Sequence, residues 1–244
     1  MSELDVLEDD LKIASRILEW EVGDIWGHVG TRMPSGEGVT LKMFRRPEQE
    51  DVEDWIIRFD FDMKKISGVG RPPTEAAIYT EIFKARPDVQ AIVHCHAPMC
   101  IALGLAGKKI DAIHMQSSAF SGGVPIFPKP IFIIDEDEGK ELARAMEQTN
   151  AIVINGHGMV MLGKSIDEVC VRSLYLERTA KMQAIAHSLG FESPNAEFRA
   201  YMEKTKEKHR EHLNKVRGPG HYIAEWKYYK EKIRKGEYWN RGWV

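Results

Sequence analysis

The sequence has few cysteines, no long apolar run and almost no excess of charge. Its three cysteines, Cys95, Cys100 and Cys170, are too few for a disulfide framework and favour a reducing compartment. No stretch is apolar for long enough to span a bilayer. A net charge of −3 shows no basic excess for nucleic acid or anionic lipid. The acidic N-terminal residues lack the apolar segment of a signal peptide. We therefore expect a cytoplasmic protein without a nucleic-acid or membrane partner.

Alternating helical and strand patterns are present instead. The 244 residues are 43% hydrophobic, which is enough for one sizeable core. Apolar residues repeat with helical spacing over residues 7–20, and alternation predicts strands over residues 39–44 and 55–61. Thr74 is a good N-cap for a helix that ends at Ala85, before Arg-Pro.

The second half predicts a long helix and a distinct C-terminal segment. Ser165 and Glu168 form a capping-box pattern for a helix from Ile166 to about residue 190. Residues 197–216 are charged and helical, and a Gly-Pro-Gly sequence then precedes an aromatic, amphipathic stretch. This segment would either pack on the core or cross to a neighbouring subunit. Its aromatic side chains are costly to expose, which favours the subunit-crossing arm: Trp226, Tyr229, Trp239 and Trp243.

Two histidines at the end of an apolar strand pattern are the strongest functional signal. His94 and His96 are two residues apart, and alternate strand residues point to the same face. Two imidazoles on one face can converge on a divalent metal ion. Cys95 between them points to the opposite face and is interpreted as a core residue.

A third histidine and a glutamate extend this pattern. His157 follows another apolar run and lies between two glycines, which permit a close approach of the backbone or a positive φ. Glu75 precedes the first histidine pair and would lie near the start of a helix. Three imidazoles and a carboxylate would make an open metal site for Lewis-acid chemistry. An isolated His-x-His pair is more often structural, and spacing alone does not establish convergence.

The order Glu75, His94-x-His96 and then His157 resembles the class II aldolase and adducin-head family. The Arg-Pro-Asp sequence over residues 86–88 and the start of the helix after His157 continue the likeness. It covers roughly residues 8–190. The family includes sugar-phosphate aldolases, pentulose-phosphate epimerases and aromatic-acid decarboxylases, so the resemblance is specific for fold but not for substrate.

The resemblance implies a three-layer α/β/α fold with a central mixed, largely antiparallel sheet. It implies a catalytic domain over residues 1–195, followed by a helical extension over residues 196–244. It also implies a homotetramer with sites at subunit interfaces. One divalent ion per subunit would be held by His94, His96 and His157, with Glu75 as an acid, a base or a resting-state ligand. Imidazole-rich sites accept Zn²⁺, Mn²⁺ or Fe²⁺, and the sequence does not choose between them.

The sequence departs from the sugar-phosphate branch at positions that handle phosphate. Gly27-His28 replaces a Gly-Asn pair, and Pro72 and Pro73 before Glu75 have no N–H groups to offer. Met115 replaces a tyrosine, and a thioether cannot donate a proton.

Cationic side chains stand in this region instead. His28, Arg32 and Arg71 would surround a substrate carboxylate, since arginine binds carboxylates in a bidentate fork. An ordinary surface ion pair is an equally good explanation for each arginine.

These features favour a metal-dependent carbon–carbon lyase acting on a small carboxylic acid. The preferred reaction is decarboxylation of a hydroxylated aromatic or heteroaromatic acid through a metal-stabilised enolate, with Glu75 or His28 handling the proton. The alternatives are an aldolase for a non-phosphorylated hydroxy-keto acid, an iron-dependent oxygenase and a non-catalytic adducin-like module.

Overall fold

The computed structural model describes residues 3–44, 56–217 and 221–237. In these residues, eight strands form one sheet in the order β4-β3-β2-β1-β5-β8-β7-β6. Neighbouring strands are antiparallel except β6 and β7, which are parallel. The strands are β1 (His28–Arg32), β2 (Gly38–Met43), β3 (Ile56–Asp60), β4 (Lys65–Gly68), β5 (Ala91–Cys95), β6 (Ile126–Phe127), β7 (Ala151–Ile154) and β8 (Gly158–Gly163).

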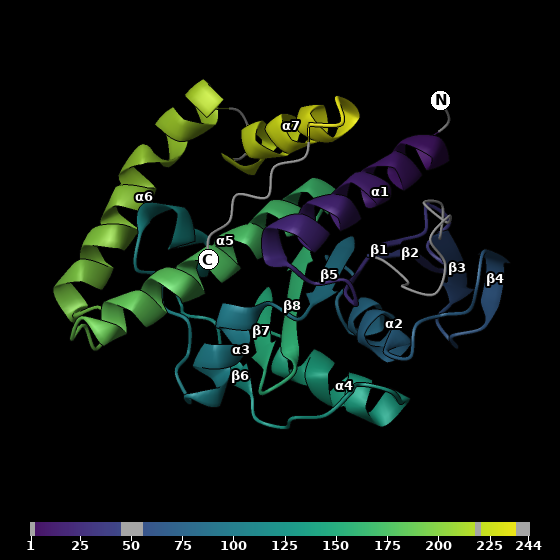
Figure 1. The fold of residues 1–244 in the computed structure, drawn as a ribbon, viewed down its shortest axis with the longest axis horizontal. Coiled ribbons are helices and arrows are strands. Elements are labelled where there is room, and N and C mark those ends of the chain that lie inside the picture. The colour runs from purple at the N-terminus through teal and green to yellow at the C-terminus, as the bar shows by residue number, and fades with distance from the viewer. Residues whose placement is uncertain (1–2, 45–55, 218–220, 238–244) are drawn as a thin grey trace.

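Helices cover both faces of the sheet, so the molecule has three layers (Figure 1). One apolar core lies between the sheet and α1, α3 and α5, and the other lies between the sheet and α2 and α4. The expected α/β/α fold with a mixed, largely antiparallel sheet is confirmed. The helices are α1 (Glu3–Val22), α2 (Ala76–Ala85), α3 (Pro98–Leu105), the short 3₁₀ helix η1 (Met115–Phe120), α4 (Glu136–Ala145), α5 (Ile166–Ser188), α6 (Ala196–Arg217) and α7 (His221–Arg234).

Most predicted elements are present, and Ser165 is the N-cap of α5 as expected, but the capping contacts predicted for α2 and α5 are absent. The residue that caps α2 is Glu75 instead of Thr74, and its side chain makes no capping hydrogen bond. Ser165 does precede α5, yet its side chain makes no capping hydrogen bond either. The Glu168 carboxylate accepts the backbone N–H of Lys164 at 2.7 Å, so the expected reciprocal box with Ser165 does not form. Propensity predicted both helices, but not the hydrogen bonds at their starts: Glu75 is held by the distant backbone of Ile133, and Glu168 by the nearby backbone of Lys164.

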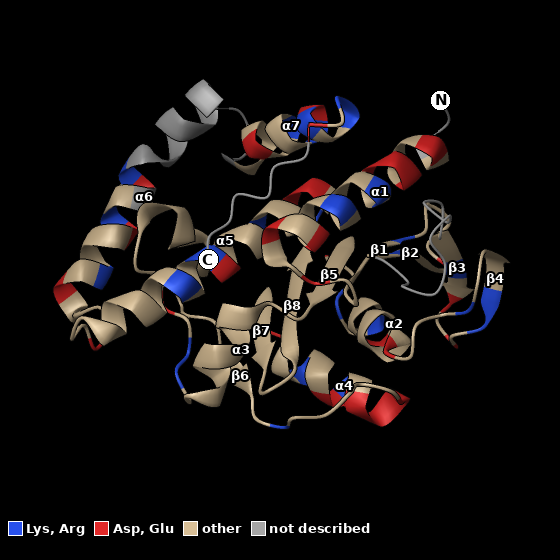
Figure 2. Ribbon diagram, viewed as in Figure 1, with Lys and Arg blue, Asp and Glu red and all other residues tan. Residues whose placement is uncertain are grey.

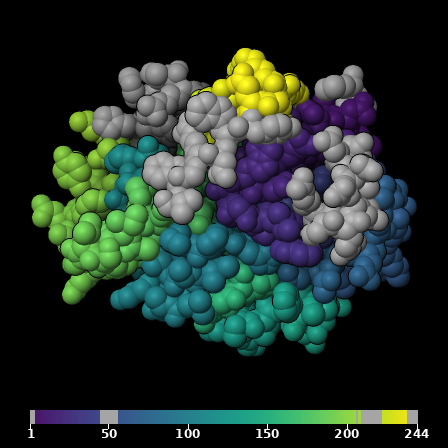
Figure 3. Space-filling model, in the orientation of Figure 1, coloured from purple at the N-terminus to yellow at the C-terminus, as the bar shows by residue number. Residues whose placement is uncertain are grey.

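The described part of the C-terminal extension packs on its own chain. Trp226 and Tyr229 of α7 are buried in the core cluster that contains α1 and α5. Figure 3 shows α7 lying against α1, and Figure 2 shows the basic end of α7 beside the acidic start of α1. These two aromatic side chains are therefore buried within one subunit. Their burial no longer argues for an arm that crosses to a neighbouring subunit. Trp239 and Trp243 lie outside the described residues.

Among the described residues, no helix is long and apolar enough to cross a membrane.

Candidate metal centre

Strand pairing in the middle of the sheet brings two histidines together. His94 lies in β5 and is directly opposite His28 in the neighbouring antiparallel strand β1. The centroids of their imidazole rings are 5.5 Å apart. Both side chains are buried. The register of β1 against β5 therefore fixes the distance between the two rings.

The other two histidines follow strands and turn toward His94. His96 comes directly after β5, and its ring centroid lies 5.1 Å from that of His94. His157 lies in the tight turn between β7 and β8, with its ring centroid 5.0 Å from that of His94. The convergence predicted from the His-x-His pattern is present in the structure.

Two glycines make the turn around His157 possible, for different reasons. Gly156 has a φ of +65°, a conformation that other residues rarely adopt. Gly158 has no such φ, but a Cβ there would lie 2.7 Å from the carbonyl oxygen of Cys95. Gly158 therefore permits β8 to approach β5 closely beside His94.

Glu75 joins the cluster from the helical layer that contains α2. It precedes α2, and its Oε1 accepts the backbone N–H of Ile133 at 3.0 Å. Its Oε2 lies 3.2 Å from Nε2 of His94 and 3.4 Å from Nε2 of His157. One oxygen is thus anchored by the backbone while the other faces the imidazoles.

The four side chains fit a divalent metal ion. One possible ligand atom from each of Glu75, His94, His96 and His157 lies within 4.8 Å of all the others. Nε2 of His94 and both ring nitrogens of His157 are buried without a hydrogen-bond partner among the described residues. Buried polar atoms normally have partners, so nitrogens that lack one and face a common point are suited to metal ligation. A set of three imidazoles and a carboxylate accepts zinc, manganese or iron.

The electrostatics of Glu75 and His94 favour the forms that bind metal, whereas for His96 the effect of burial is outweighed by Asp24, which raises the pKa of His96. Burial opposes ionisation of Glu75, but the close imidazoles of His157 and His94 and the backbone N–H of Ile133 outweigh it and hold its pKa well below the usual range. Burial lowers the pKa of His94. A carboxylate and a neutral imidazole are the forms that bind metal ions.

His28 is held in a neutral form beside the cluster. Burial and the nearby His94 lower its pKa from 6.5 to about 3. The hydroxyl group of Tyr79 donates to the backbone carbonyl of His28 at 3.0 Å and lies 3.5 Å from its Nδ1. His28 is therefore placed for proton chemistry, but it does not add the positive charge expected for binding a carboxylate.

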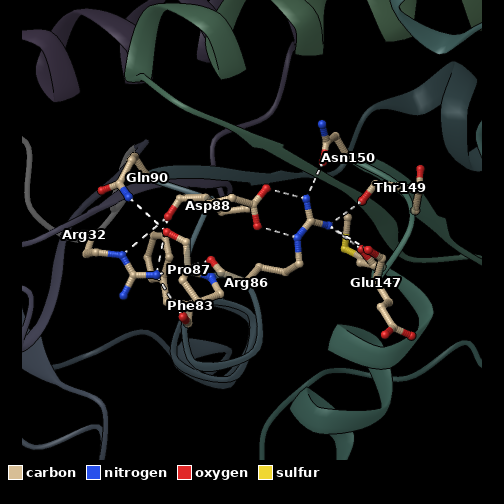
Figure 4. Close-up of polar contacts among 11 residues, drawn as sticks. Arg32, Phe83, Arg86, Pro87, Asp88, Gln90, Glu147, Thr149 and Asn150 are labelled. Carbon is tan, nitrogen blue, oxygen red and sulfur yellow. Dashed lines mark hydrogen bonds and ion pairs between the residues drawn. The ribbon is translucent and has the colours of Figure 1, made fainter.

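Arg32 does not lie at the cluster. Its guanidinium group donates to the carbonyl oxygen of Phe83 at 2.8 Å and also reaches that of Val89 (Figure 4). The same group lies 4.8 Å from the centroid of the Phe83 ring. Arg32 and His28 stand at opposite ends of β1, roughly 13 Å apart for four strand residues. Arg32 therefore joins β1 to the connection between α2 and β5.

Arg71 is exposed, four positions before Glu75 in the sequence. Its guanidinium group contacts no carboxylate among the residues that the structure describes. Its predicted role in substrate binding remains a prediction.

Three further residues at the centre carried no signal in the sequence. Asp24 contacts His96, the N–H of Ile133 holds Glu75, and the ring of Phe132 lies 5.1 Å from that of His157, centroid to centroid. Each is a single residue in a connecting segment, without periodicity or a motif. Only the folded chain places them beside residues that are far away in the sequence.

Comparison with known proteins agrees with this geometry. A 3,4-dihydroxyphthalate decarboxylase from Arthrobacter keyseri is 27% identical over 180 residues, which cover 68% of this chain and 72% of that protein. The chain spans only about half the length of two other such decarboxylases, from Rhodococcus jostii and a Terrabacter strain. An L-fuculose phosphate aldolase from Methanococcus maripaludis is 30% identical over 125 residues, covering 50% of this chain and 65% of the aldolase.

The fold is also similar to solved structures over nearly its whole length. An aldolase II superfamily protein from Pseudomonas syringae has a TM-score of 0.79 at 21% identity, with 97% of this chain and 95% of that chain covered. The family model for the class II aldolase and adducin N-terminal domain matches residues 18–184, a range that contains Glu75 and all three clustered histidines. This chain therefore belongs to the class II aldolase and adducin family.

Proposed function

We propose that this protein is a metal-dependent carbon–carbon lyase that decarboxylates a hydroxylated aromatic or heteroaromatic acid. The observation that carries the proposal is the convergence of Glu75, His94, His96 and His157, with the neutral imidazole of His28 next to them. A bound divalent ion would withdraw electron density from a substrate oxygen as carbon–carbon bond cleavage proceeds. Resemblance to 3,4-dihydroxyphthalate decarboxylases supports this choice of reaction.

The reaction needs a residue that transfers one proton to the substrate, and two residues are candidates. When the carboxylate leaves as CO₂, the electron pair of the broken bond stays on the substrate, and one proton replaces CO₂ on carbon. Glu75 and His28 are the titratable groups next to the predicted ligands that can hold this proton. His28 is buried and neutral, so it can take part in a proton relay, although burial makes its ring a weaker base than a free imidazole.

Two features of the surroundings support an aromatic, non-phosphorylated substrate. Phe132 is 63% exposed and its ring lies at 64° to that of His157, so an aromatic surface is available beside the predicted ligands. Pro72 and Pro73, just before Glu75, provide no N–H groups for a phosphate. Arg71 is the remaining candidate for pairing with a substrate carboxylate.

The test first measures bound metal and then measures the products of turnover. Purified protein is analysed for bound zinc, manganese and iron, and His157→Ala is analysed beside it. We expect about one ion per subunit in the wild type and loss of most of it in the variant. Full occupancy in the variant would contradict the three-histidine site. A wild type without stoichiometric metal would favour the adducin-like module.

The metal-loaded protein is then supplied with hydroxy-aromatic acids, and CO₂ release and oxygen uptake are recorded. We expect CO₂ in stoichiometric yield without oxygen consumption. Oxygen consumption during turnover would instead indicate an iron-dependent oxygenase.

An aldolase is the second candidate, because an L-fuculose phosphate aldolase is 30% identical over half of the chain. Hydroxy-keto acids and a ketose 1-phosphate are therefore included in the assay. Cleavage of the ketose 1-phosphate, with no CO₂ from any aromatic acid, would overturn the decarboxylase proposal. Cleavage of only the hydroxy-keto acids would establish the non-phosphorylated aldolase.

The predicted homotetramer with interfacial sites remains a prediction. Trp26 and Met115 are about half exposed in a single chain, as expected if a neighbouring subunit covers them. Light scattering of the purified protein gives the mass directly, and a monomeric mass would contradict the prediction.

A further inference from the structure

A buried carboxylate, that of Asp24, contacts the Nδ1 side of the His96 imidazole. Asp24, in the segment between α1 and β1, is only 6% exposed. Its Oδ2 lies 3.0 Å from Nδ1 of His96 and accepts the backbone N–H of the same residue at 2.8 Å. Its Oδ1 accepts the backbone N–H of Trp26 at 2.8 Å. Asp24 therefore contacts both the main chain and the ring of His96.

This arrangement selects one tautomer of His96. An aspartate oxygen that already accepts a backbone N–H is suited to accept the Nδ1 proton as well. With the proton on Nδ1, the lone pair of His96 is on Nε2, the nitrogen on the far side of the ring from Asp24. An asparagine in this position cannot replace the carboxylate, because one of the two oxygens would become an NH₂ group that faces an N–H donor.

The three clustered histidines differ in how their Nδ1 atoms are held. Nδ1 of His94 lies 3.0 Å from the backbone carbonyl oxygen of Met159. Nδ1 of His157 has no hydrogen-bond partner among the described residues. His96 is thus the one of the three whose Nδ1 is held by a side chain, so a point mutation can remove its support.

Close packing fixes the position of the Asp24 carboxylate. A Cβ on Gly27 would lie 2.8 Å from Oδ2 of Asp24 and 2.4 Å from the ring of Phe44. Glycine at position 27 therefore leaves room for the carboxylate between the start of β1 and His96. The glycine of the Gly27-His28 pair has a structural explanation that does not involve phosphate.

We infer that Asp24 is a positioning residue, which fixes the tautomer and ring orientation of His96 for metal binding. The inference rests on the metal site of the proposed function. It assigns no contact with the substrate to Asp24. It predicts that Asp24 acts on metal affinity through His96 alone.

The test compares Asp24→Asn with a matched control in metal-free protein. The control is Glu177→Gln, because the Glu177 carboxylate anchors the backbone N–H groups of Met99 and Cys100 just after His96 but does not contact its ring. Zinc and manganese affinities are measured by competition with a chelator. We expect Asp24→Asn to weaken metal binding by about 10–100-fold, as is typical for such supporting groups. Glu177→Gln should stay within about threefold of the wild type. Equal affinities for Asp24→Asn and the wild type would overturn the inference.

A second measurement needs no metal, and its decisive part uses the wild type. Nitrogen-15 NMR spectra of the imidazoles distinguish a proton on Nδ1 from one on Nε2. In metal-free wild type at pH 8, we expect the His96 proton on Nδ1, and a shift of this population in Asp24→Asn. A wild-type His96 with its proton on Nε2 would overturn the inference, even if Asp24→Asn fails to fold. A wild type that binds no metal but keeps the Nδ1 proton would refute the proposed function and leave the selection of the tautomer by Asp24 in place.

Discussion

The two carboxylate oxygens of Glu75 have different roles: one is anchored by the backbone and the other faces the imidazoles. The backbone N–H of Ile133 holds Oε1, so the carboxylate cannot rotate freely. Oε2 is left to face His94 and His157. Because the carboxylate is already oriented, little conformational entropy is lost when it binds a ligand or a proton.

Replacing Glu75 by glutamine should separate metal binding from turnover. The three imidazoles remain in Glu75→Gln, and the amide oxygen can still accept the N–H of Ile133. We expect the variant to keep its metal and to lose at least about two orders of magnitude in kcat, as is typical when a general acid–base group is removed. Metal analysis and steady-state kinetics on the same preparation check this. Turnover near that of the wild type would limit Glu75 to a structural role.

His28 should make the stability of the metal-free protein depend on pH. Its pKa falls from 6.5 to about 3 on folding, because burial disfavours the charged ring. Between these pH values the unfolded chain binds one more proton than the folded chain. The contribution of His28 to stability is therefore fully present above pH 6.5 and is lost at about 1.4 kcal/mol per unit as the pH falls.

Urea unfolding of the metal-free protein between pH 7 and pH 5 measures this dependence. In His28→Gln the decline of the unfolding free energy with falling pH should be shallower than in the wild type by that amount. His94 is present in both proteins, so the difference between the two slopes reports on His28. Parallel slopes would show that His28 is not kept neutral by folding.

At the level of elements, His96 and His157 lie in the connections that follow β5 and β7. The sequence predicted the residues of the cluster by evidence of different kinds. The His94-x-His96 pattern at a strand end and the glycines around His157 predicted these positions from local geometry. Glu75 was proposed from its position at a predicted helix start, and resemblance to a family gave it a role. Asp24 and the register of β1 against β5 could not be predicted, since they depend on pairing between distant segments. Arg32 was predicted to contact a substrate carboxylate, but it lies at the far end of β1 from His28. A sequence does not show which end of a strand faces the site.

The turn between β7 and β8 provides a matched pair of glycine substitutions. A Cβ in Gly158→Ala would lie 2.7 Å from the carbonyl oxygen of Cys95 and 3.3 Å from Cε1 of His94. We expect a loss of about 1–3 kcal/mol of stability and weaker metal binding, because β8 must move away from His94. In Gly156→Ala the nearest atom to the new Cβ is 3.4 Å away, and the positive φ should cost about 1–2 kcal/mol.

Denaturant unfolding and metal titration distinguish the two variants. Gly156→Ala should lose stability while it keeps most of its metal affinity. Gly158→Ala should lose both. Equal metal affinities in the two variants would show that the approach of β8 to β5 does not control the centre.

At the level of the whole molecule, Arg178 of α5 joins the first and last described helices. Its guanidinium group pairs with Glu21 of α1 at 3.0 Å and with Glu225 of α7 at 2.6 Å. It also donates to the hydroxyl group of Tyr229 at 2.6 Å. Side chains of α1 and α7 thus share one cation of α5 above the larger apolar core.

Removing this cation should destabilise the protein more than removing one at the surface. Arg178→Met leaves two partly buried carboxylates without their cation, a loss that costs about 3–5 kcal/mol for a fully buried pair. Since Arg178 is 32% exposed, we expect a smaller loss of about 2 kcal/mol. The control is Arg234→Met, whose exposed ion pair with Asp9 should contribute less than about 1 kcal/mol. Urea unfolding of both variants checks the difference, and equal losses would contradict it.

The packing of α7 on α1 also has a consequence for synthesis on the ribosome. Asp9 and Asp10 lie in α1 and are translated long before their partner Lys230, which lies in α7. At about 5–20 residues per second, α1 must wait roughly 10–40 s for α7 to be made. During that interval the surface that Trp226 later covers is open to water. A nascent chain of this protein therefore exposes an apolar surface on α1 and α5 until α7 has been made, and we expect ribosome-associated chaperones to bind that surface.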